Sequence, residues 1–215
     1  MNAHFSRSRS TVLAVALATL FVAALPALAQ EGLRSQASFQ FMGLIPKDST
    51  GTDLSGNPIT EHATRSGGFL AGYTFNLNRW AAVEGDYGYS RDTQNFSSLF
   101  GPSAVQTRLH EMTGAFVVRM PVSVARLHPY ALGGTGALRF DPTNNSPSMV
   151  PGALAQTKPV FLYGGGVNVD LRRNFGVRVD YRGLLSRIPD FKLATLTVGR
   201  TTHLAEPSVG VYVRF

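Results

Sequence analysis

The amino-acid sequence predicts an all-β fold, an eight-stranded antiparallel up-and-down β-barrel. Apolar and polar residues alternate with a period of two in eight segments of the chain. The links between these segments are alternately long and short, as expected when the tight turns lie at one end of a barrel and the loops at the other. Only 15% of the residues are charged and 22 are glycine, which argues against a disordered chain or a helical bundle.

A secretory signal peptide is predicted for residues 1–29. This segment has Arg7 and Arg9 but no acidic residue, continues with the apolar run TVLAVALATLFVAAL, and ends with Ala27 and Ala29 in an A-x-A arrangement. The apolar run is shorter than the roughly 20 residues of a transmembrane helix, so a cleaved signal is favoured over an anchor. A mature barrel domain is therefore expected over residues 30–215.

The first four predicted strands are SQASFQFMGLI, GGFLAGYTFNL, AAVEGDYGYSR and TRLHEMTGAFVVRM. Apolar residues occupy every second position over most of each segment, which is the period of a strand with one apolar face. In the third strand, for example, Val83 and Tyr87 alternate with Glu84 and Asp86. Long polar links follow the first and third strands, whereas residues 78–79 alone connect the second to the third.

The last four predicted strands are PYALGGTGALRF, PVFLYGGGVNVDL, FGVRVDYRGLL and the terminal EPSVGVYVRF. In the first of these, Arg139 is assigned to the polar face. Its apolar face is predicted to carry Tyr130, Leu132, Leu138 and Phe140. The terminal segment is apolar at every second position from Val209 to Phe215, and it is expected to pair with the first strand around SFQFMG.

The same alternation fits two opposite barrels. A soluble barrel turns its apolar face inward, whereas an outer-membrane barrel turns that face to lipid and its polar face to the lumen. Aromatic residues gather near the strand ends, as membrane interfaces favour. An apolar edge strand would aggregate in water, but a barrel closed in lipid has no free edge. Together with the signal peptide, these features favour a transmembrane β-barrel.

Three segments resemble the small eight-stranded outer-membrane β-barrel family, the OmpA-like and OmpX-like barrels. HPYALGGTGALRF is similar to a PYxGxGxG fifth-strand segment, FGVRVDYRGLL to a late strand, and VGVYVRF to the closing strand with its terminal aromatic residue. The resemblance covers nearly all of residues 33–215. It implies an integral protein of the Gram-negative outer membrane with periplasmic mature termini. No peptidoglycan-binding domain follows Phe215, so a role as a cell-wall anchor is not expected.

An ion-pair network is predicted in the lumen, because an eight-stranded barrel is just wide enough to be filled by side chains and buried charges must pair. The predicted role is structural or surface-interacting, with a plugged lumen. The alternative is a narrow porin-like channel for small solutes or ions, gated by Glu84 or Glu111 with Arg139 or Arg178. The predicted network comprises Glu84, Asp86, Glu111, Arg119, Arg139, Asp170, Arg178, Asp180, Arg182, Glu206 and Arg214.

The expected partners follow from the resemblance and from the surface charges. The terminal pattern of Val211, Val213 and Phe215 is implied to be a signal for the barrel assembly machinery. Outer-membrane lipid, lipopolysaccharide and ligands of the extracellular loops are expected partners of a monomeric protein. The basic residues predicted to contact lipopolysaccharide are Arg65, Arg91, Arg108, Lys158, Arg187 and Lys192.

A lipid-modifying enzyme is the weaker alternative. Such an enzyme needs a serine beside a histidine and an acid, and Ser90 with His110 is the nearest candidate pair. The other candidate histidines, His62, His128 and His203, are isolated, and the chain has no cysteine. No metal or cofactor is expected, because the histidines are isolated and the loop segment DSTGTD has too few acidic residues for a calcium loop. No nucleic acid is expected, because the basic residues behind the net charge of +7 are scattered. The prediction is therefore a non-enzymatic barrel.

Overall fold

The computed structural model describes residues 34–47, 49–52, 58–63, 65–98, 101–120, 126–143, 154–189 and 201–215. These residues form ten antiparallel strands in one sheet. The strands are β1 (Ser35–Pro46), β2 (Ser49–Thr52), β3 (Pro58–Ala63), β4 (Ser66–Asn76), β5 (Ala81–Ser98), β6 (Gly101–Arg119), β7 (Leu127–Pro142), β8 (Gln156–Arg172), β9 (Phe175–Arg187) and β10 (Thr201–Arg214). Within the described ranges there is no helix long and apolar enough to cross a membrane. The predicted signal peptide lies outside them.

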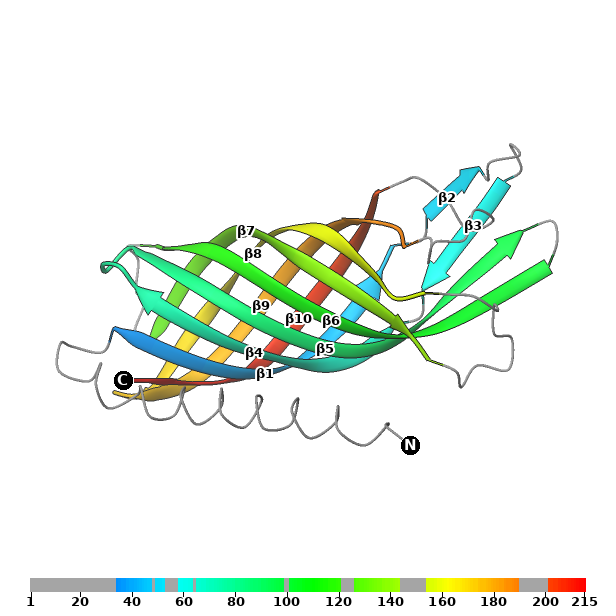
Figure 1. Ribbon diagram of the computed structural model, residues 1–215. Coiled ribbons are helices and arrows are strands. Elements are labelled where there is room, and N and C mark those ends of the chain that lie inside the picture. Colours follow the sequence, from blue (N-terminus) through cyan, green and yellow to red (C-terminus); the bar gives the residue numbers. More distant parts are fainter. Residues whose placement is uncertain are drawn as a thin grey trace, which may run out of the picture.

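Eight of these strands close into a barrel (Figure 1). Going round the wall, β1 pairs with β4, the chain order then runs from β4 to β10, and β10 returns to β1. Every neighbouring pair is antiparallel. The prediction of an eight-stranded antiparallel up-and-down barrel is confirmed.

The hairpin of β2 and β3 is an addition to the predicted fold, because the sequence pattern there indicated only a polar loop. Residues Thr60–Ala63 of β3 pair with Gln94–Ser97 of β5. Residues Gly101–Val105 of β6 pair with β5 alone, since the ladder between β6 and β7 begins at Thr107 and Gln106 already bonds to Thr143. Strands β5 and β6, with β3 on the edge of β5, therefore continue as a β-ribbon beyond one end of the barrel wall (Figure 1).

The two ends of the barrel differ. The turn end carries Arg34, Phe215, the short links at Leu77–Trp80 and Arg173–Asn174, and the longer link at residues 120–126 (Figure 1). The loop end carries the links at residues 143–155 and 188–200, and the two-residue link at 99–100 that joins the extended strands β5 and β6. At the turn end the Asn78 side-chain oxygen accepts hydrogen bonds from the backbone N–H groups of Trp80 (2.7 Å) and Ala81 (2.8 Å). This local bonding explains why so few residues can reverse the chain there.

The seam between β1 and β10 closes the barrel at the predicted place. The backbone N–H of Ser35 donates to the Phe215 carbonyl (3.0 Å), and the Phe215 N–H donates back to Ser35 (2.9 Å). Phe41 lies opposite Val209 in the register. The first strand therefore has no free edge at this seam.

The outer wall between the two ends is apolar. The predicted outward residues Val209, Val211 and Val213 are 52%, 41% and 46% exposed, and similar exposure recurs around the barrel. Met120, which directly follows β6, lies ten positions after His110. With the usual strand rise and a tilt of about 45°, they span about 23 Å, close to the apolar band of a membrane barrel.

The strand β7 was predicted, but the prediction of which face points to the lipid was wrong, because its large apolar residues face the lumen. Tyr130, Leu132, Leu138 and Phe140 are all buried, whereas Arg139 faces outward. The ladder with β6 sets this orientation by placing Leu138 opposite Glu111. Alternation specifies that two faces exist, and here the inner face is the apolar one.

The cysteine-free chain allows a direct test of the closing seam. We expect Phe41→Cys with Val209→Cys to form a disulfide, because residues directly opposite in an antiparallel pair have Cα atoms about 4.5–5.5 Å apart. Phe41→Cys with Val211→Cys is the control, since a shift of two residues exceeds disulfide reach. Cross-linking would be read by mass spectrometry after oxidation. Equal cross-linking of both pairs would contradict the register.

Candidate functional site

The candidate site is the charged middle of the lumen. Inward-facing positions of β5, β6, β9 and β10 supply the seven most buried charged residues there. They are Glu84, Asp86, Glu111, Arg178, Asp180, Arg182 and Glu206, each at most 7% exposed. Alternation brings these side chains to one face of each strand, and closure of the barrel brings the four strands together.

Arg178 forms the centre of the first cluster. Its Nη1 and Nη2 atoms donate to the two carboxylate oxygens of Glu84 at 2.6 and 2.8 Å, and its Nε donates to Asp180 at 2.7 Å. The Tyr130 ring lies 4.9 Å from the guanidinium, and the Tyr130 hydroxyl donates to Asp180. The Thr74 hydroxyl donates to Glu84 at 2.7 Å. This is a bidentate, charge-assisted pair of the strong kind.

Gly166 makes room for this cluster. A Cβ atom at this position would lie 2.1 Å from the Asp180 carboxylate and 2.6 Å from the Tyr130 hydroxyl. Two glycines next to it on β8, Gly164 and Gly165, also lie against neighbouring backbone. The GGG run of the predicted sixth strand is therefore required by close approach at the site.

Arg182 forms the second cluster, one step closer to the loop end. Its Nη2 donates to Glu111 at 2.5 Å and is 2.8 Å from the Thr113 hydroxyl. Looser ion pairs join its Nη1 to Asp86 (3.6 Å) and its Nε to Glu206 (3.4 Å). Three carboxyl groups thus surround a single guanidinium, and Glu111 alone among them accepts a hydrogen bond from it.

A third, half-exposed cluster lies at the turn end. Arg214 donates to Asp170 at 3.0 Å, and His128 Nε2 lies 3.0 Å from the same carboxylate oxygen. The Tyr212 hydroxyl also donates to Asp170. Arg119 donates to the Asn76 side chain at this end. These two predicted arginines therefore lie near the mouth of the lumen.

Arg139 does not belong to the lumen, and its prediction was wrong. Its side chain is 59% exposed on the outer wall, where Nε pairs with Asp141 at 3.2 Å. Without Arg139, the predicted network has four basic members facing six acidic ones, so it is more acidic than the sequence suggested. The error has the same cause as the inverted assignment of β7.

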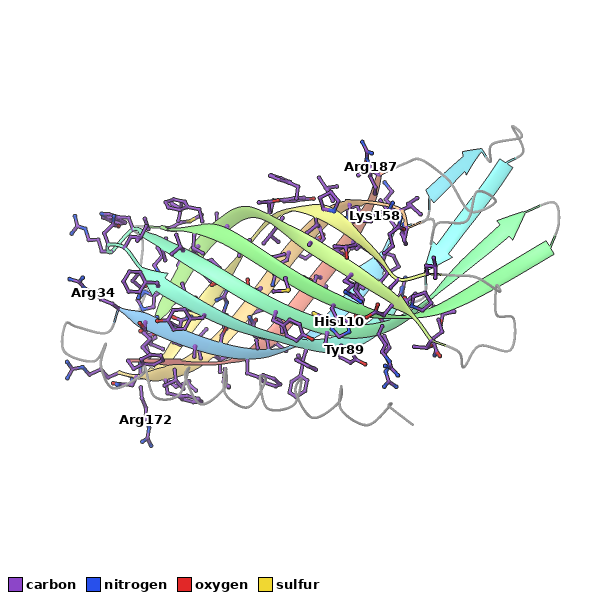
Figure 2. The ribbon with its side chains drawn as sticks, viewed as in Figure 1. Arg34, Tyr89, His110, Lys158, Arg172 and Arg187 are labelled. Atoms are coloured by element: carbon purple, nitrogen blue, oxygen red, sulfur yellow. The ribbon has the colours of Figure 1, made fainter. Side chains whose placement is uncertain are left out.

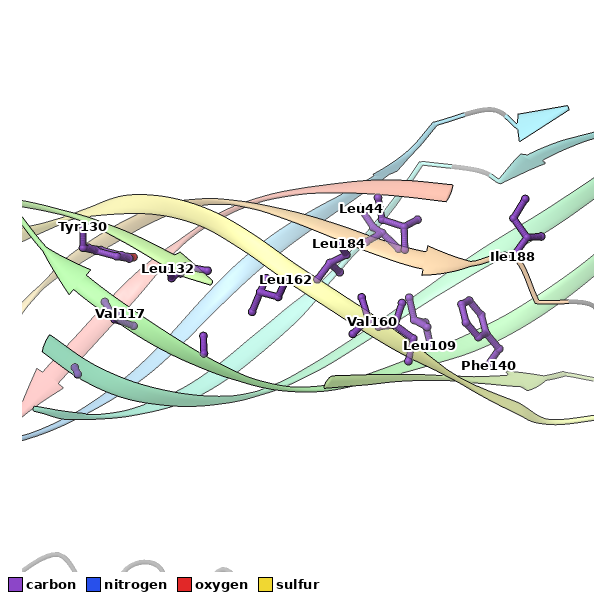
Figure 3. Close-up of a cluster of buried hydrophobic side chains, with 14 residues drawn as sticks. Leu44, Leu109, Val117, Tyr130, Leu132, Phe140, Val160, Leu162, Leu184 and Ile188 are labelled. Atoms are coloured by element: carbon purple, nitrogen blue, oxygen red, sulfur yellow. The ribbon is translucent and has the colours of Figure 1, made fainter. Parts of the chain in front are cut away.

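A layer of leucines fills the lumen on the loop side of the charges (Figure 3). On β9, β10 and β6, a leucine lies two residues beyond Arg182, Glu206 and Glu111 respectively. Seven of the eight barrel strands contribute one leucine, each at most 4% exposed. They are Leu44, Leu70, Leu109, Leu138, Leu162, Leu184 and Leu204. The sequence analysis missed this layer because it assigned apolar residues to the lipid.

The proposed Ser90–His110 pair is not formed. Ser90 faces the lumen and is 1% exposed, whereas His110 faces outward, where its Nδ1 atom lies 2.8 Å from the Tyr87 hydroxyl. The two residues therefore lie on opposite sides of the wall. The side chain of His62 lies outside the described part of the structure, and His128 and His203 contact Asp170 and Tyr163.

A closed eight-stranded barrel with an apolar outer wall and a charged interior defines the class of small membrane-spanning β-barrels. Residues 13–202 match the family of the outer membrane protein beta-barrel domain. The chain belongs to this family and is an outer-membrane β-barrel protein. No curated protein sequence matches it.

Solved structures share the fold at low sequence identity. OprG from Pseudomonas aeruginosa is 14% identical with a TM-score of 0.60, and the match covers 84% of this chain and 95% of OprG. AlkL is 18% identical with a TM-score of 0.52, covering 84% and 89% of the two chains. Neisserial surface protein A is 12% identical with a TM-score of 0.51, covering 84% and 97%. At these identities the likeness shows the fold alone.

The two arginines of opposite fate provide a test of the network. Arg178→Ala should lower the free energy of unfolding by about 3–5 kcal/mol, because it leaves Glu84 buried and unpaired. Arg139→Ala, which removes the same charge from the outer wall, should cost less than about 1 kcal/mol. Urea unfolding in lipid vesicles measures both. Equal losses would contradict the placement of the two side chains.

Proposed function

We propose that this protein is a monomeric structural or surface-interaction barrel of the outer membrane with a plugged lumen. The observation that carries the proposal is the leucine layer over the Arg182 cluster. An apolar constriction excludes water, and ions do not cross an unhydrated pore. The paired guanidiniums below it fill the remaining width of a barrel of this size.

The proposal includes the processing and orientation of the chain. Residues 1–29 act as a cleaved signal peptide, and the domain from residue 30 to 215 inserts with both termini in the periplasm. The turn end then faces the periplasm and the loop end faces the exterior. The turn–loop asymmetry supports this orientation, because outer-membrane barrels have short periplasmic turns and longer extracellular loops.

A narrow channel is the second candidate. The observation behind it is a recess next to Glu84 and Arg178, although the free space in this recess is too small to hold a water molecule. Gln36, Arg119 and Asn168 also line this recess. An ion could enter only if this recess widened, and it would still have to pass Arg182 and the leucines, so the plugged barrel remains the better proposal.

Planar-bilayer recording distinguishes these two functions. We expect the purified protein to give no discrete conductance steps, since the leucine layer and both arginine clusters obstruct the same path. A wide porin added to the same bilayer serves as the positive control. Discrete steps of the wild type that change in Arg178→Ala would support the gated channel and overturn the plug.

Assembly by the barrel machinery is proposed to use Val211, Val213 and Phe215. The aromatic ring of Phe215 lies 6.4 Å from that of Tyr73, and its backbone pairs with Ser35 at the closing seam. Its side chain is thus available both for recognition before closure and for contact after it.

Substitution of Phe215 tests this role. We expect Phe215→Ala to lower the amount of heat-modifiable barrel in outer membranes severalfold, with little effect on refolding into detergent, because only the first process needs the machinery. Phe215→Tyr should behave as the wild type, because it keeps the ring. Gel migration with and without boiling measures folded protein. Normal insertion of Phe215→Ala would exclude the signal.

A further inference from the structure

Three arginines gather on the outer wall at the loop end of the apolar band. Arg91 of β5 lies opposite Arg108 of β6, and Arg139 of β7 lies opposite His110 of β6. All three arginines are exposed. We call this group, together with Tyr87, Tyr89 and Asp141, the girdle patch.

Hydrogen bonds and ring contacts order the girdle patch. Arg91 Nε donates to the Tyr89 hydroxyl at 3.0 Å, and the Tyr89 ring lies 5.2 Å from the His110 ring. Figure 2 shows Tyr89 and His110 next to each other near the loop end. The Tyr87 hydroxyl, 2.8 Å from His110 Nδ1, holds the imidazole from the other side. These cross-strand contacts position the arginines on the wall.

The girdle patch carries excess positive charge. Asp141 is the one carboxylate of the patch. Its two oxygens accept hydrogen bonds from Arg139 Nε at 3.2 and 3.3 Å. Within the described residues, the bonds of Arg91 and Arg139 to the patch use Nε, so their Nη nitrogens remain for a ligand. Guanidinium forks are suited to phosphate, which they bind through two parallel hydrogen bonds.

An aromatic shelf continues from the girdle patch into the apolar band. The Phe69 ring lies 5.6 Å from Tyr89 and 5.9 Å from Phe39, which it stacks against. Next to these rings, Phe41 is 69% exposed and Met112 is 66% exposed. A ligand that fits both parts has a phosphate at the membrane boundary and acyl chains below it.

A second Tyr–His pair shows that the basic cluster is local. Tyr163 lies 2.8 Å from His203 Nε2 elsewhere on the wall, at the same end. Among the described residues of β9 and β10, a single arginine faces outward near this pair. It is Arg187, which lies opposite Thr201. Both places have the interfacial aromatic and imidazole groups, but the girdle patch concentrates three arginines on adjacent strands.

We propose that the girdle patch binds one phosphate of lipopolysaccharide, with the lipid A acyl chains lying on the aromatic shelf. The proposal rests on the orientation proposed above, in which the loop end lies in the outer leaflet. Arg91, Arg108 and Arg139 bind the phosphate, and Tyr87, Tyr89 and His110 are positioning residues. Lipid A matches the site because it joins phosphate to several acyl chains at the boundary of this leaflet.

Native mass spectrometry of the detergent-purified protein with added lipid A tests the site. The variant is Arg91→Gln, Arg108→Gln and Arg139→Gln. Its matched control is Arg79→Gln, Arg172→Gln and Arg173→Gln, which removes three exposed arginines from the turn end. Figure 2 shows Arg172 at that opposite end. Boiled and unboiled gel migration confirms that both variants fold.

We expect the girdle variant to bind lipid A about a hundredfold more weakly, since each arginine contributes roughly fivefold near a charged lipid surface. The turn-end control should bind as the wild type does. Dephosphorylated lipid A and phosphatidylglycerol should bind weakly to all three proteins. Equal losses in both variants, or equal binding of phosphatidylglycerol, would overturn the site in favour of general charge attraction. The assay is done in detergent, so its result does not depend on the orientation of the barrel in the membrane. If lipid A binds but the loops are not exposed at the cell surface, the proposed orientation is wrong and the binding site still stands.

Discussion

An arginine inside an eight-stranded barrel has little water around it, so its guanidinium must be satisfied by the opposite wall. Arg178 and Arg182 are at most 2% exposed and both come from β9. Arg178 pairs with Glu84 on β5, which is four strands away in either direction round the wall. The ion pairs of Arg178 with Glu84 and of Arg182 with Asp86 therefore act across the diameter, where no backbone hydrogen bond can, whereas Arg182 and Glu206 join neighbouring strands. The pairs across the diameter hold opposite walls of the barrel at a set distance. The leucine layer fills the lumen next to them, on the side of the loop end.

This arrangement also determines how charge is distributed between the inside and the outside. Five carboxyl groups are enclosed with the two buried arginines. These five acidic residues are thereby kept off the described outer wall, where Asp141 stands beside Arg139 and further arginines lie near both ends. A net positive sequence thus produces an acidic lumen and a basic rim. In this fold, the positive net charge is suited to anionic lipid surfaces rather than to nucleic acid.

The fold could be read from the sequence because alternation, link lengths and the terminal strand all pointed to the same ring of strands. The side on which each residue faces was less accessible. Ten of the eleven predicted lumen residues face inward, because a charged residue in the middle of a membrane-crossing strand is costly against lipid. The prediction for Arg139 was wrong, since β7 has large apolar side chains on its lumen face and mostly small side chains on its outer face. Pairing with β6 decides that orientation, and a single strand's periodicity does not contain it.

The ribbon beyond the barrel wall changes what the protein presents outside the membrane. A membrane-crossing strand needs about 9–11 residues, whereas β5 and β6 have 18 and 19. At about 3.3 Å per residue, the surplus of each strand extends roughly 25 Å further. Paired main chains with β3 on the edge of β5 are stiffer than a free loop. The barrel thus carries a β-structured extension that projects beyond the lipid head groups.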